Sequence, residues 1–401
     1  MIPRDESVLY QERKRIHVAL VNTWRVINSK GGTERVFCDL ANALSLMGYR
    51  VTALCVDPYQ GEPGFNLSNA VRFINAGREG KPLLRRGLLK FIRTFNIDRS
   101  KYRRNREKNE FAWKAPLLKR EIEGGAPVDV YISFQPETTY ILSHLVGVVS
   151  PIITMFHQEP KTLFAKSAIE MSQQALRASR VNTVLLPSYI NQVRNVCPEA
   201  HVVAIPNTIS YFENPSELKE KKIVCVGRVA IQKRVDLLIK AFALIKDKIP
   251  EWGVEYWGEI DVEPKYKKKI FRLISDLDVK DRFHFCGSTD NIENVLNSAS
   301  IFAFPSAWEG FSLALGEAMS KGLPVVGCVD CSGTNEMVTN AVSGFLTEPV
   351  PEKFAFALET LAKNRELRVI LGERARKEIK KCSPENIWPL WDDLILQVVK
   401  K

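Results

Sequence analysis

Two carboxylates and a predicted helix start lie within one short stretch of this sequence. The stretch, residues 304–319, follows an apolar run, turns through Gly310 and continues as an amphipathic helix, with Glu309 in the turn and Glu317 in the helix. A helix that begins directly after a buried strand has free N–H groups and the positive end of its dipole at the edge of the sheet, where both attract phosphate. We therefore predict a phosphate site here, with a carboxylate on each side for sugar hydroxyls. The N–H groups concerned belong to Phe311, Ser312 and Leu313.

Two basic residues can complete such a site. Arg228 and Lys233 are five positions apart across another strand-to-helix turn. The planar fork of the arginine and the mobile charge of the lysine can therefore converge on one diphosphate. The alternative is a pair of solvated surface cations. Glu317 could accept hydrogen bonds from ribose hydroxyls, or be an exposed helix residue. Glu309 could hold sugar hydroxyls, or be an acid favoured by the helix dipole.

Two further candidates lie in the N-terminal half of the chain. Gly31, Gly32 and Thr33 separate an apolar run from an amphipathic helix, and the glycines allow the backbone to approach an anion or a hydroxyl-rich group closely. His157 follows another apolar run, and it could donate to a sugar hydroxyl or a phosphate, or act on an acceptor proton. The alternatives are a plain helix-entry turn and a structural histidine.

An alternation of apolar runs and amphipathic helices positions all of these residues. It extends from a run at 15–21 to one at 202–205, pauses at Pro206-Asn207-Thr208 and restarts at 222. This pattern predicts an α/β protein with two Rossmann-like, doubly wound domains that face a central cleft, and the candidates follow strand ends, where such sheets bind ligands. We expect an N-terminal domain at 1–206, completed by a helix at about 384–401 that crosses back to it, and a C-terminal domain at 207–383. The polar residues 1–14 are expected to form a loose leader.

The basic character of the chain is local. The net charge is +11, and residues 81–120 alone hold fourteen Lys and Arg residues against three Asp and Glu, an excess of eleven. Leucine and phenylalanine alternate with Arg and Lys between residues 83 and 95, a pattern that resembles an interfacial helix for anionic lipid. The alternatives for this basic insert are a solvated helical excursion or, less favoured, contact with nucleic-acid phosphates.

Several classes of protein are not indicated by the sequence. The start lacks the apolar core of a signal peptide, and no apolar run reaches the ~18 residues that cross a bilayer, so we expect a cytoplasmic protein, either free or peripheral on the inner face of the membrane. The eight cysteines are scattered, and Cys328-x-x-Cys331 has no second pair to complete a zinc site. No metalloprotease, P-loop, nucleophile-elbow or dinucleotide motif is present, so we expect no metal and no cofactor.

Two longer motifs resemble those of the retaining GT-B glycosyltransferases of family 4. Residues 309–317, Glu-Gly-Phe-Ser-Leu-Ala-Leu-Gly-Glu, resemble the E-x7-E element of that family, and residues 226–236 resemble its V-G-R-x4-K-x2-D segment. Shorter similar stretches are the linker 205–207, the glycine loop 31–35, and residues 333–336 and 344–346. The resemblance is strongest over 205–347 and absent over 81–120. Thr208 stands where the family commonly has glycine, and Trp257-Gly-Glu259 replaces a more glycine-rich loop.

The resemblance implies a nucleotide-diphosphate sugar, with UDP or GDP, on the C-terminal domain and an acceptor on the N-terminal domain. Arg228 and Lys233 would stabilise the leaving diphosphate, and Glu317 would bind the ribose. Glu309 would bind the donor sugar, with a covalent nucleophile as the less favoured role, and His157 would contact that sugar near the reacting carbon. The donor would also meet the backbone at Gly310, Phe311, Ser312 and Leu313.

The implied activity is retaining, metal-independent transfer of a hexose-type sugar to a hydroxyl of a glycan or lipid-linked glycan, as in cell-surface polysaccharide or lipopolysaccharide biosynthesis. The alternatives are a GT-B-like protein that binds sugar nucleotide or RNA without turnover, and another GT-B enzyme such as a sugar-nucleotide epimerase. The base, the sugar, the acceptor, the linkage and the oligomeric state stay open, and the departures at 208 and 257–259 add to the uncertainty about base and sugar.

Overall fold

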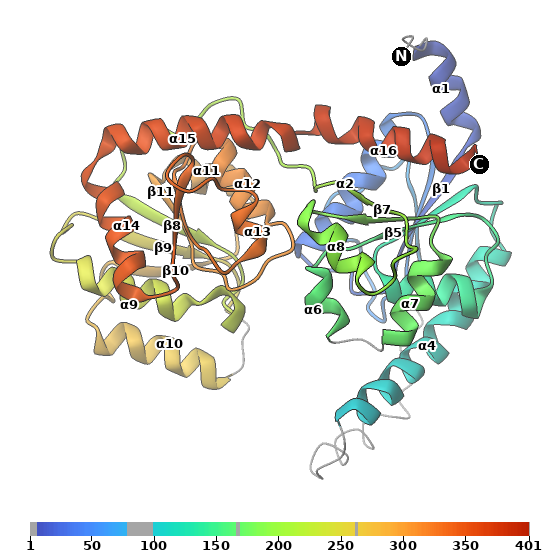
Figure 1. The fold of residues 1–401 in the computed structure, drawn as a ribbon, viewed down its shortest axis with the longest axis horizontal. Helices are drawn as coiled ribbons and strands as arrows, with labels where there is room; N and C mark the ends of the chain where they lie inside the picture. The colour runs from blue at the N-terminus through green and yellow to red at the C-terminus, as the bar shows by residue number, and fades with distance from the viewer. Residues whose placement is uncertain (1–5, 78–98, 166–168, 261–263, 401) are drawn as a thin grey trace. The chain divides into compact units, whose positions relative to one another are not determined.

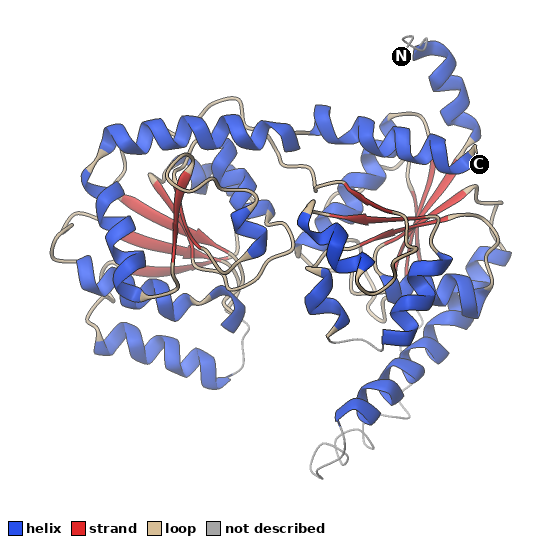
Figure 2. Ribbon diagram, in the orientation of Figure 1, coloured by secondary structure: helices blue, strands red, loops and turns tan. Residues whose placement is uncertain are grey.

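A computed structural model of the chain describes residues 6–77, 99–165, 169–260 and 264–400 (Figure 1). The chain divides into two compact units, residues 1–205 with 388–401, and residues 206–387. Each unit contains one parallel sheet with helices packed around it (Figure 2). The predicted α/β architecture with two Rossmann-like domains is confirmed.

The sheet of the first unit has seven parallel strands in the order β3-β2-β1-β4-β5-β6-β7. Its central strands are short apolar runs that are buried along their whole length, as expected where helices cover both faces of a parallel sheet. The strands are β1 His17–Asn22, β2 Arg50–Cys55, β3 Arg72–Asn75, β4 Val130–Ser133, β5 Ile152–Met155, β6 Val181–Val184 and β7 Val202–Ala204. The helices are α1 Glu6–Arg15, α2 Gly32–Leu46, α4 Arg99–Glu123, α5 Pro136–Tyr140, the π-helix η2 Ile141–Val146, α6 Pro160–Phe164, α7 Ile169–Ala178, α8 Ser188–Arg194 and α16 Pro384–Val399.

The start of the chain corrects one expectation, because residues 6–15 form the helix α1 instead of a loose leader. Arg13 on this helix is 9% exposed, and its Nε and Nη2 donate to the two carboxylate oxygens of Asp392 on α16, at 2.8 and 2.7 Å. Tyr49 donates its hydroxyl to the same carboxylate at 2.6 Å, and burial together with Asp392 raises the pKa of Tyr49 well above its usual value. This buried network fastens α1 and α16 to the first unit.

The sheet of the second unit has six parallel strands in the order β10-β9-β8-β11-β12-β13. The strands are β8 Lys222–Val226, β9 Gly253–Trp257, β10 Phe283–Gly287, β11 Ile301–Phe304, β12 Val325–Cys328 and β13 Gly344–Thr347. The helices are the 3-10 turn η3 Ile231–Lys233, α9 Val235–Ile245, α10 Pro264–Asp276, α11 Ile292–Asn297, α12 Leu313–Ser320, α13 Ser332–Asn335, α14 Pro351–Lys363, α15 Arg365–Ile379 and the 3-10 turn η4 Lys380–Cys382.

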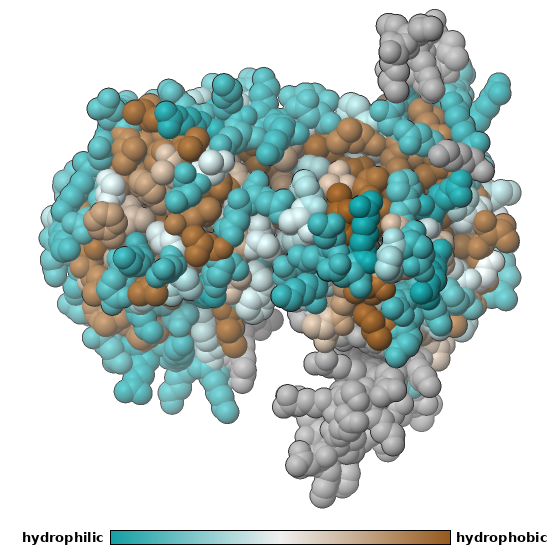
Figure 3. Space-filling model, viewed as in Figure 1, coloured by the Kyte–Doolittle hydropathy of each residue, from teal (hydrophilic) through white to brown (hydrophobic). Residues whose placement is uncertain are grey.

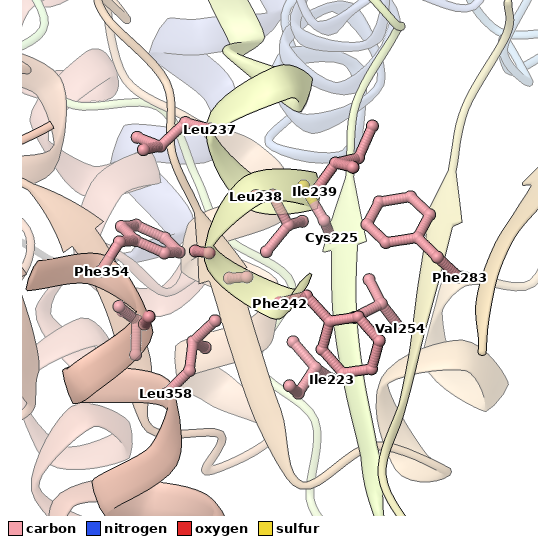
Figure 4. Close-up of a cluster of buried hydrophobic side chains, with 14 of the residues drawn as sticks. Ile223, Cys225, Leu237, Leu238, Ile239, Phe242, Val254, Phe283, Phe354 and Leu358 are labelled. Carbon is pink, nitrogen blue, oxygen red and sulfur yellow. The ribbon is translucent and has the colours of Figure 1, made fainter. Parts of the chain in front are cut away.

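Helix α9 lies at the centre of the hydrophobic core of the second unit, because it is apolar on nearly every side (Figure 4). It packs against the sheet on one side and against α14 on the other. Phe242 is fully buried there, and truncating such a side chain to alanine costs about 3–5 kcal/mol. This core fixes the strands whose C-terminal ends carry the candidate residues. The core residues labelled in Figure 4 are Ile223, Cys225, Leu237, Leu238, Ile239, Phe242, Val254, Phe283, Phe354 and Leu358.

The predicted basic insert, residues 81–120, is described only in part, because residues 78–98 lie outside the described residues. Helix α4 includes Pro116 and continues through it to Glu123. Around that proline, Ala115 and Leu118 are buried against the core of the first unit, and Phe111 and Trp113 pack on the same cluster. The C-terminal half of α4 is therefore an ordinary core helix.

Candidate active site

Gly227 directly follows strand β8 and leaves room for the side chain of Lys233. A Cβ at this position would lie 2.9 Å from Cε of Lys233, and the φ of +152° further disfavours any other residue. The adjacent Arg228 is exposed, its backbone carbonyl accepts from the Tyr256 hydroxyl at 3.3 Å, and no side chain within the described residues pairs with its guanidinium. One cation is thus packed against the backbone and the other extends into solvent.

Lys233 forms an ion pair with Glu309, which follows strand β11. The Nζ to Oε1 distance is 2.7 Å, and the two side chains are 18% and 13% exposed. The same Nζ lies 5.2 Å from the ring centroid of Phe304, a cation–π distance. Two predicted site residues from different loops are therefore in direct contact.

Two hydrogen bonds, one between backbone groups and one from a side chain, hold these two loops together. Ala307 donates its N–H to the carbonyl of Gln232 at 2.8 Å, and Gln232 Nε2 donates to the carbonyl of Trp308 at 2.5 Å. Gly333 packs on the other side of the turn, where a Cβ would lie 2.6 Å from the carbonyl oxygen of Glu309. The position of the Glu309 backbone is thus fixed from two directions.

Helix α12 begins beside this turn, as the sequence predicts. Ser312 is its N-cap, and its hydroxyl accepts from the N–H of Leu315 at 3.3 Å. Across the ranges that the structure describes, the backbone N–H groups of Phe311, Ser312 and Leu313 have no hydrogen-bond acceptor. These groups and the positive helix end are available to an anion.

Glu317, one turn further along α12, is only 3% exposed. The interpretation of this residue as an ordinary exposed helix glutamate is therefore wrong. The next residue towards the N-terminus, Gly316, allows the linker residue Ile209 to pack closely, since a Cβ there would lie 2.5 Å from Ile209 Cδ1. A buried carboxylate is costly unless polar groups surround it, which is consistent with a position built for function.

Two residues that shape this edge of the sheet, Gly258 and Asp330, were not predicted from the sequence. Gly258, after β9, approaches Gly227 so closely that a Cβ would lie 2.1 Å from the Gly227 carbonyl oxygen, and its φ is +144°. Asp330, after β12, accepts two hydrogen bonds from Arg234, which adopts a left-handed φ of 45° at the start of α9. A glycine directly follows each of the neighbouring strands β8 and β9, and this pattern could have identified Gly258. No local signal identified Asp330.

Three candidates of the first unit, Gly31, Gly32 and Thr33, lie where the loop after β1 enters α2. Gly31 is the N-cap of α2, and a Cβ there would lie 2.3 Å from Oε2 of Glu34, so the glycine leaves room for this carboxylate. Oε1 of Glu34 accepts from the Ser29 hydroxyl at 2.9 Å. Gly32 and Thr33 form the first turn of the helix. The structure places these three residues at the start of α2, and their role as an acceptor or phosphate loop stays a prediction.

His157 follows β5, and its imidazole is desolvated. Both ring nitrogens are buried and have no hydrogen-bond partner among the residues that the structure describes. The ring stacks on Phe134, with 4.8 Å between centroids and 16° between planes. Burial lowers the pKa of His157 to about 3. The side chain is therefore a neutral imidazole at pH 7, which suits a hydrogen-bonding role better than that of a proton donor with a pKa near 7.

The described part of the chain gives little support for a reactive thiol, a metal site or a membrane span. The eight cysteines are free, and burial raises the pKa of Cys328 to about 12, so this residue is a thiol and not a thiolate at neutral pH. The described residues contain no group of three or more His, Cys, Asp or Glu side chains placed to hold a metal ion. Among the same residues, no helix is both long and apolar enough to cross a membrane.

Comparison with solved structures gives the fold class, which is GT-B. Sucrose-phosphate synthase from Thermosynechococcus elongatus superposes with a TM-score of 0.78 at 18% identity, covering 96% of this chain and 99% of that one. Anabaena HepE in complex with UDP and glucose superposes with a TM-score of 0.71 at 16% identity, covering 95% and 100%. At these identities the likeness concerns the fold alone.

The sequence comparisons find a family similarity in the second unit. Residues 207–378 match the model of the family described as glycosyl transferases group 1. An uncharacterized glycosyltransferase of Haemophilus influenzae is 30% identical over 48% of this chain and 54% of its own length. The poly(glycerol-phosphate) alpha-glucosyltransferase of Bacillus subtilis is 29% identical over 50% of this chain and 29% of its own length. The chain thus spans about half, or less, of these relatives.

Proposed function

We propose that this protein is a retaining glycosyltransferase that moves a sugar from a nucleotide-diphosphate sugar to a hydroxyl of a glycan or lipid-linked glycan. The observation that carries the proposal is the cluster in the second unit. There Lys233 touches Glu309, Arg228 is exposed on the adjoining loop, and the N-terminus of α12 lies next to Glu309. Two cations and free helix N–H groups suit a diphosphate, and two carboxylates suit the hydroxyls of the ribose and the sugar.

The proposed chemistry follows from where charge develops. As the bond between the anomeric carbon and the phosphate oxygen breaks, negative charge grows on the diphosphate, and Arg228, Lys233 and the α12 amides stabilise it. The acceptor oxygen forms a bond to the anomeric carbon on the same face. Its proton passes to the departing phosphate oxygen, so the configuration is retained and no metal is required. Glu317 holds the ribose and Glu309 the sugar, while the neutral His157 donates or accepts a hydrogen bond near the reacting carbon.

Glu309 is assigned as a sugar ligand and not as a nucleophile. Its carboxylate is paired with Lys233, and a charge-paired carboxylate is a weaker nucleophile. A trapped glycosyl-enzyme, detected as a mass increase on the peptide that contains Glu309, would reverse this assignment.

A thermal-shift screen tests the donor. UDP, GDP and their sugar conjugates are added in turn, and a ligand at 100 times its Kd stabilises the native state by about 2.7 kcal/mol. The names of two similar proteins favour a glucose-type donor with UDP as the first to try. No shift with any nucleotide would contradict the proposal.

Variants at the two cations test the role assignment. Arg228→Ala and Lys233→Ala should each lower turnover by about 100-fold or more, because each removes charge stabilisation in the transition state. Arg228→Ala should keep the unfolding midpoint of the wild type, whereas Lys233→Ala breaks the ion pair with Glu309 and should lower the midpoint modestly. Lys240→Ala, an exposed lysine on α9, is the matched control. Turnover by either variant at the level of the control would refute the assignment, and unchanged turnover in EDTA is expected for a reaction without metal.

We also propose a cytoplasmic location in which the basic insert, residues 81–120, contacts an anionic membrane that carries a lipid-linked acceptor. The excess of eleven positive charges in this segment supports the proposal. The apolar residues of α4 after position 108 pack in the hydrophobic core of the first unit. The part of the segment that contacts lipid would therefore lie before them. Sedimentation with vesicles tests it: binding to phosphatidylglycerol vesicles but not to phosphatidylcholine vesicles is expected, and equal binding or none would contradict it.

A further inference from the structure

Two exposed aromatic side chains lie beyond the C-terminal ends of adjacent strands in the first unit. Trp24 follows β1 and is 42% exposed, and Tyr59 follows β2 and is 51% exposed. Exposure alone does not mark a site, since apolar residues are scattered over the visible surface of both units (Figure 3), and Phe356 on α14 is 71% exposed. What sets Trp24 and Tyr59 apart is how firmly they are held.

Trp24 is anchored at one edge of its ring. Its backbone N–H donates to the side-chain oxygen of Asn22 at 2.9 Å. With the amide of Gln135 oriented as its hydrogen-bond partners require, Gln135 accepts from the indole Nε1 of Trp24 at 2.9 Å. Gln135 is itself buried, so the polar edge of the indole is fixed inside the protein while the rest of the ring remains accessible.

A buried carboxylate joins the two loops that carry these rings. Asp57 is fully buried, and its Oδ2 accepts from the backbone N–H groups of Val26 and Ile27 at 2.7 and 2.8 Å. Its Oδ1 accepts from the N–H of Tyr59 at 3.1 Å. Hydrogen bonds to a charged and buried acceptor are strong, so the loops after β1 and β2 form one rigid surface.

A cation completes this surface. The guanidinium of Arg25 lies over the ring of Tyr59, with 4.8 Å between its central carbon and the ring centroid. Arg25 is exposed and offers donors to hydroxyl or anionic groups beside the ring. A rigid aromatic ring next to a few fixed polar groups is the usual composition of a small-molecule site.

We infer that Trp24, Tyr59 and Arg25 form a sugar-binding platform for the acceptor. One face of a pyranose ring presents several C–H groups, and these pack on the electron-rich face of an aromatic ring. The equatorial hydroxyls at the rim of the sugar then accept from a donor such as Arg25. The inference rests on the proposed function and deepens it, because it names the residues that would bind the saccharide of the acceptor, on the loops after β1 and β2.

Saturation-transfer NMR tests the platform with defined probes, namely methyl α-D-glucopyranoside, methyl α-D-mannopyranoside and N-acetylglucosamine at millimolar concentration. We expect transfer to the ring C–H protons of at least one probe in the wild-type protein. Trp24→Ala and Tyr59→Ala should each weaken the binding by roughly three- to tenfold. Trp24→Phe should retain most of it, since a ring face remains, and Phe356→Ala should bind as the wild type does.

Thermal shifts with UDP and GDP accompany every variant and separate this inference from the proposed function. Unchanged nucleotide shifts in Trp24→Ala together with lost saccharide binding would support the platform. Saccharide binding that survives in both alanine variants, equal loss in Phe356→Ala, or no transfer to any probe in the wild type would overturn it. Absence of every nucleotide shift with saccharide binding intact would instead refute the donor proposal and leave the platform standing.

Discussion

Replacing Glu309 by glutamine should make the protein bind a free nucleoside diphosphate more tightly while it slows sugar transfer. Without ligand, Lys233 is engaged by Glu309 at 2.7 Å, so a diphosphate must draw the lysine away from this carboxylate. Glutamine keeps the size and the hydrogen-bonding shape of the side chain but removes its charge. The lysine is then free to move to the phosphate.

The size of the effect follows from the exposure of the pair. The side chains are 18% and 13% exposed, between the solvent-exposed pairs that contribute about 0–1 kcal/mol and the buried pairs whose disruption costs about 3–5 kcal/mol. An intermediate value of about 1–2 kcal/mol is therefore the cost of redirecting Lys233, and glutamine removes most of it. Since 1.4 kcal/mol is a factor of ten, the Kd of the nucleoside diphosphate should fall by roughly 5- to 30-fold.

Isothermal titration calorimetry with UDP or GDP, whichever stabilises the wild-type protein, measures this change. Glu352→Gln, which removes an exposed carboxylate at the first turn of α14, controls for the altered net charge of the protein. Repeating the titration at 0.5 M NaCl should reduce the gain, because salt screens partly exposed charges. An unchanged or raised Kd in Glu309→Gln would refute the idea that the pair competes with the ligand.

Three further changes test the framework around the site. Asp392→Ala should lower the free energy of unfolding, measured by urea denaturation, by about 3–5 kcal/mol, because the buried guanidinium of Arg13 loses its ion pair with this carboxylate. Gly258→Ala should destabilise the protein by about 2 kcal/mol or more and reduce nucleotide affinity, since its Cβ would meet the Gly227 carbonyl at 2.1 Å; the same change at the unobstructed Gly147 should cost less. In the unfolded state His157 binds a proton with its ordinary pKa of 6.5, whereas in the native state burial lowers this pKa to about 3. The free energy of unfolding therefore falls as the pH drops below 6.5. Between pH 7 and pH 5 it should fall by roughly 2 kcal/mol more in the wild type than in His157→Phe.

Much of the fold was predictable because its signals are local. Each buried strand is a run of four to six residues bounded by turn residues, and α2 and α9 show the helical spacing of apolar side chains. The start of α12 was equally readable, since Ser312 is a preferred N-cap residue that directly follows a glycine turn. Such patterns require no knowledge of what lies across the fold.

Long-range partners could not be predicted in this way. Lys233 and Glu309 are 76 residues apart, and Arg13 and Asp392 are 379 apart, so no pattern along the chain couples either pair. The polar composition of residues 1–14 suggested a loose leader, because nothing along the sequence shows that Arg13 is buried in an ion pair with Asp392, near the other end of the chain. Asp57 was overlooked for the same reason, since its role is to accept hydrogen bonds from the backbone N–H groups of Val26 and Ile27 in another loop.

The ion pair between Lys233 and Glu309 has the exposure that a ligand-exchanging pair requires. A fully exposed pair would leave both side chains mobile, and a ligand would then have to order them at the cost of side-chain entropy. A fully buried pair would hold them in place but would resist separation by several kcal/mol. Here Gly227 and Gly333 bring backbone close to both residues, so the side chains are held near their working positions by packing as well as by charge. A diphosphate can therefore take over the lysine at modest cost while the carboxylate stays in place for the sugar, which is why the effect of Glu309→Gln should be opposite in sign for binding of the nucleotide and for transfer of the sugar.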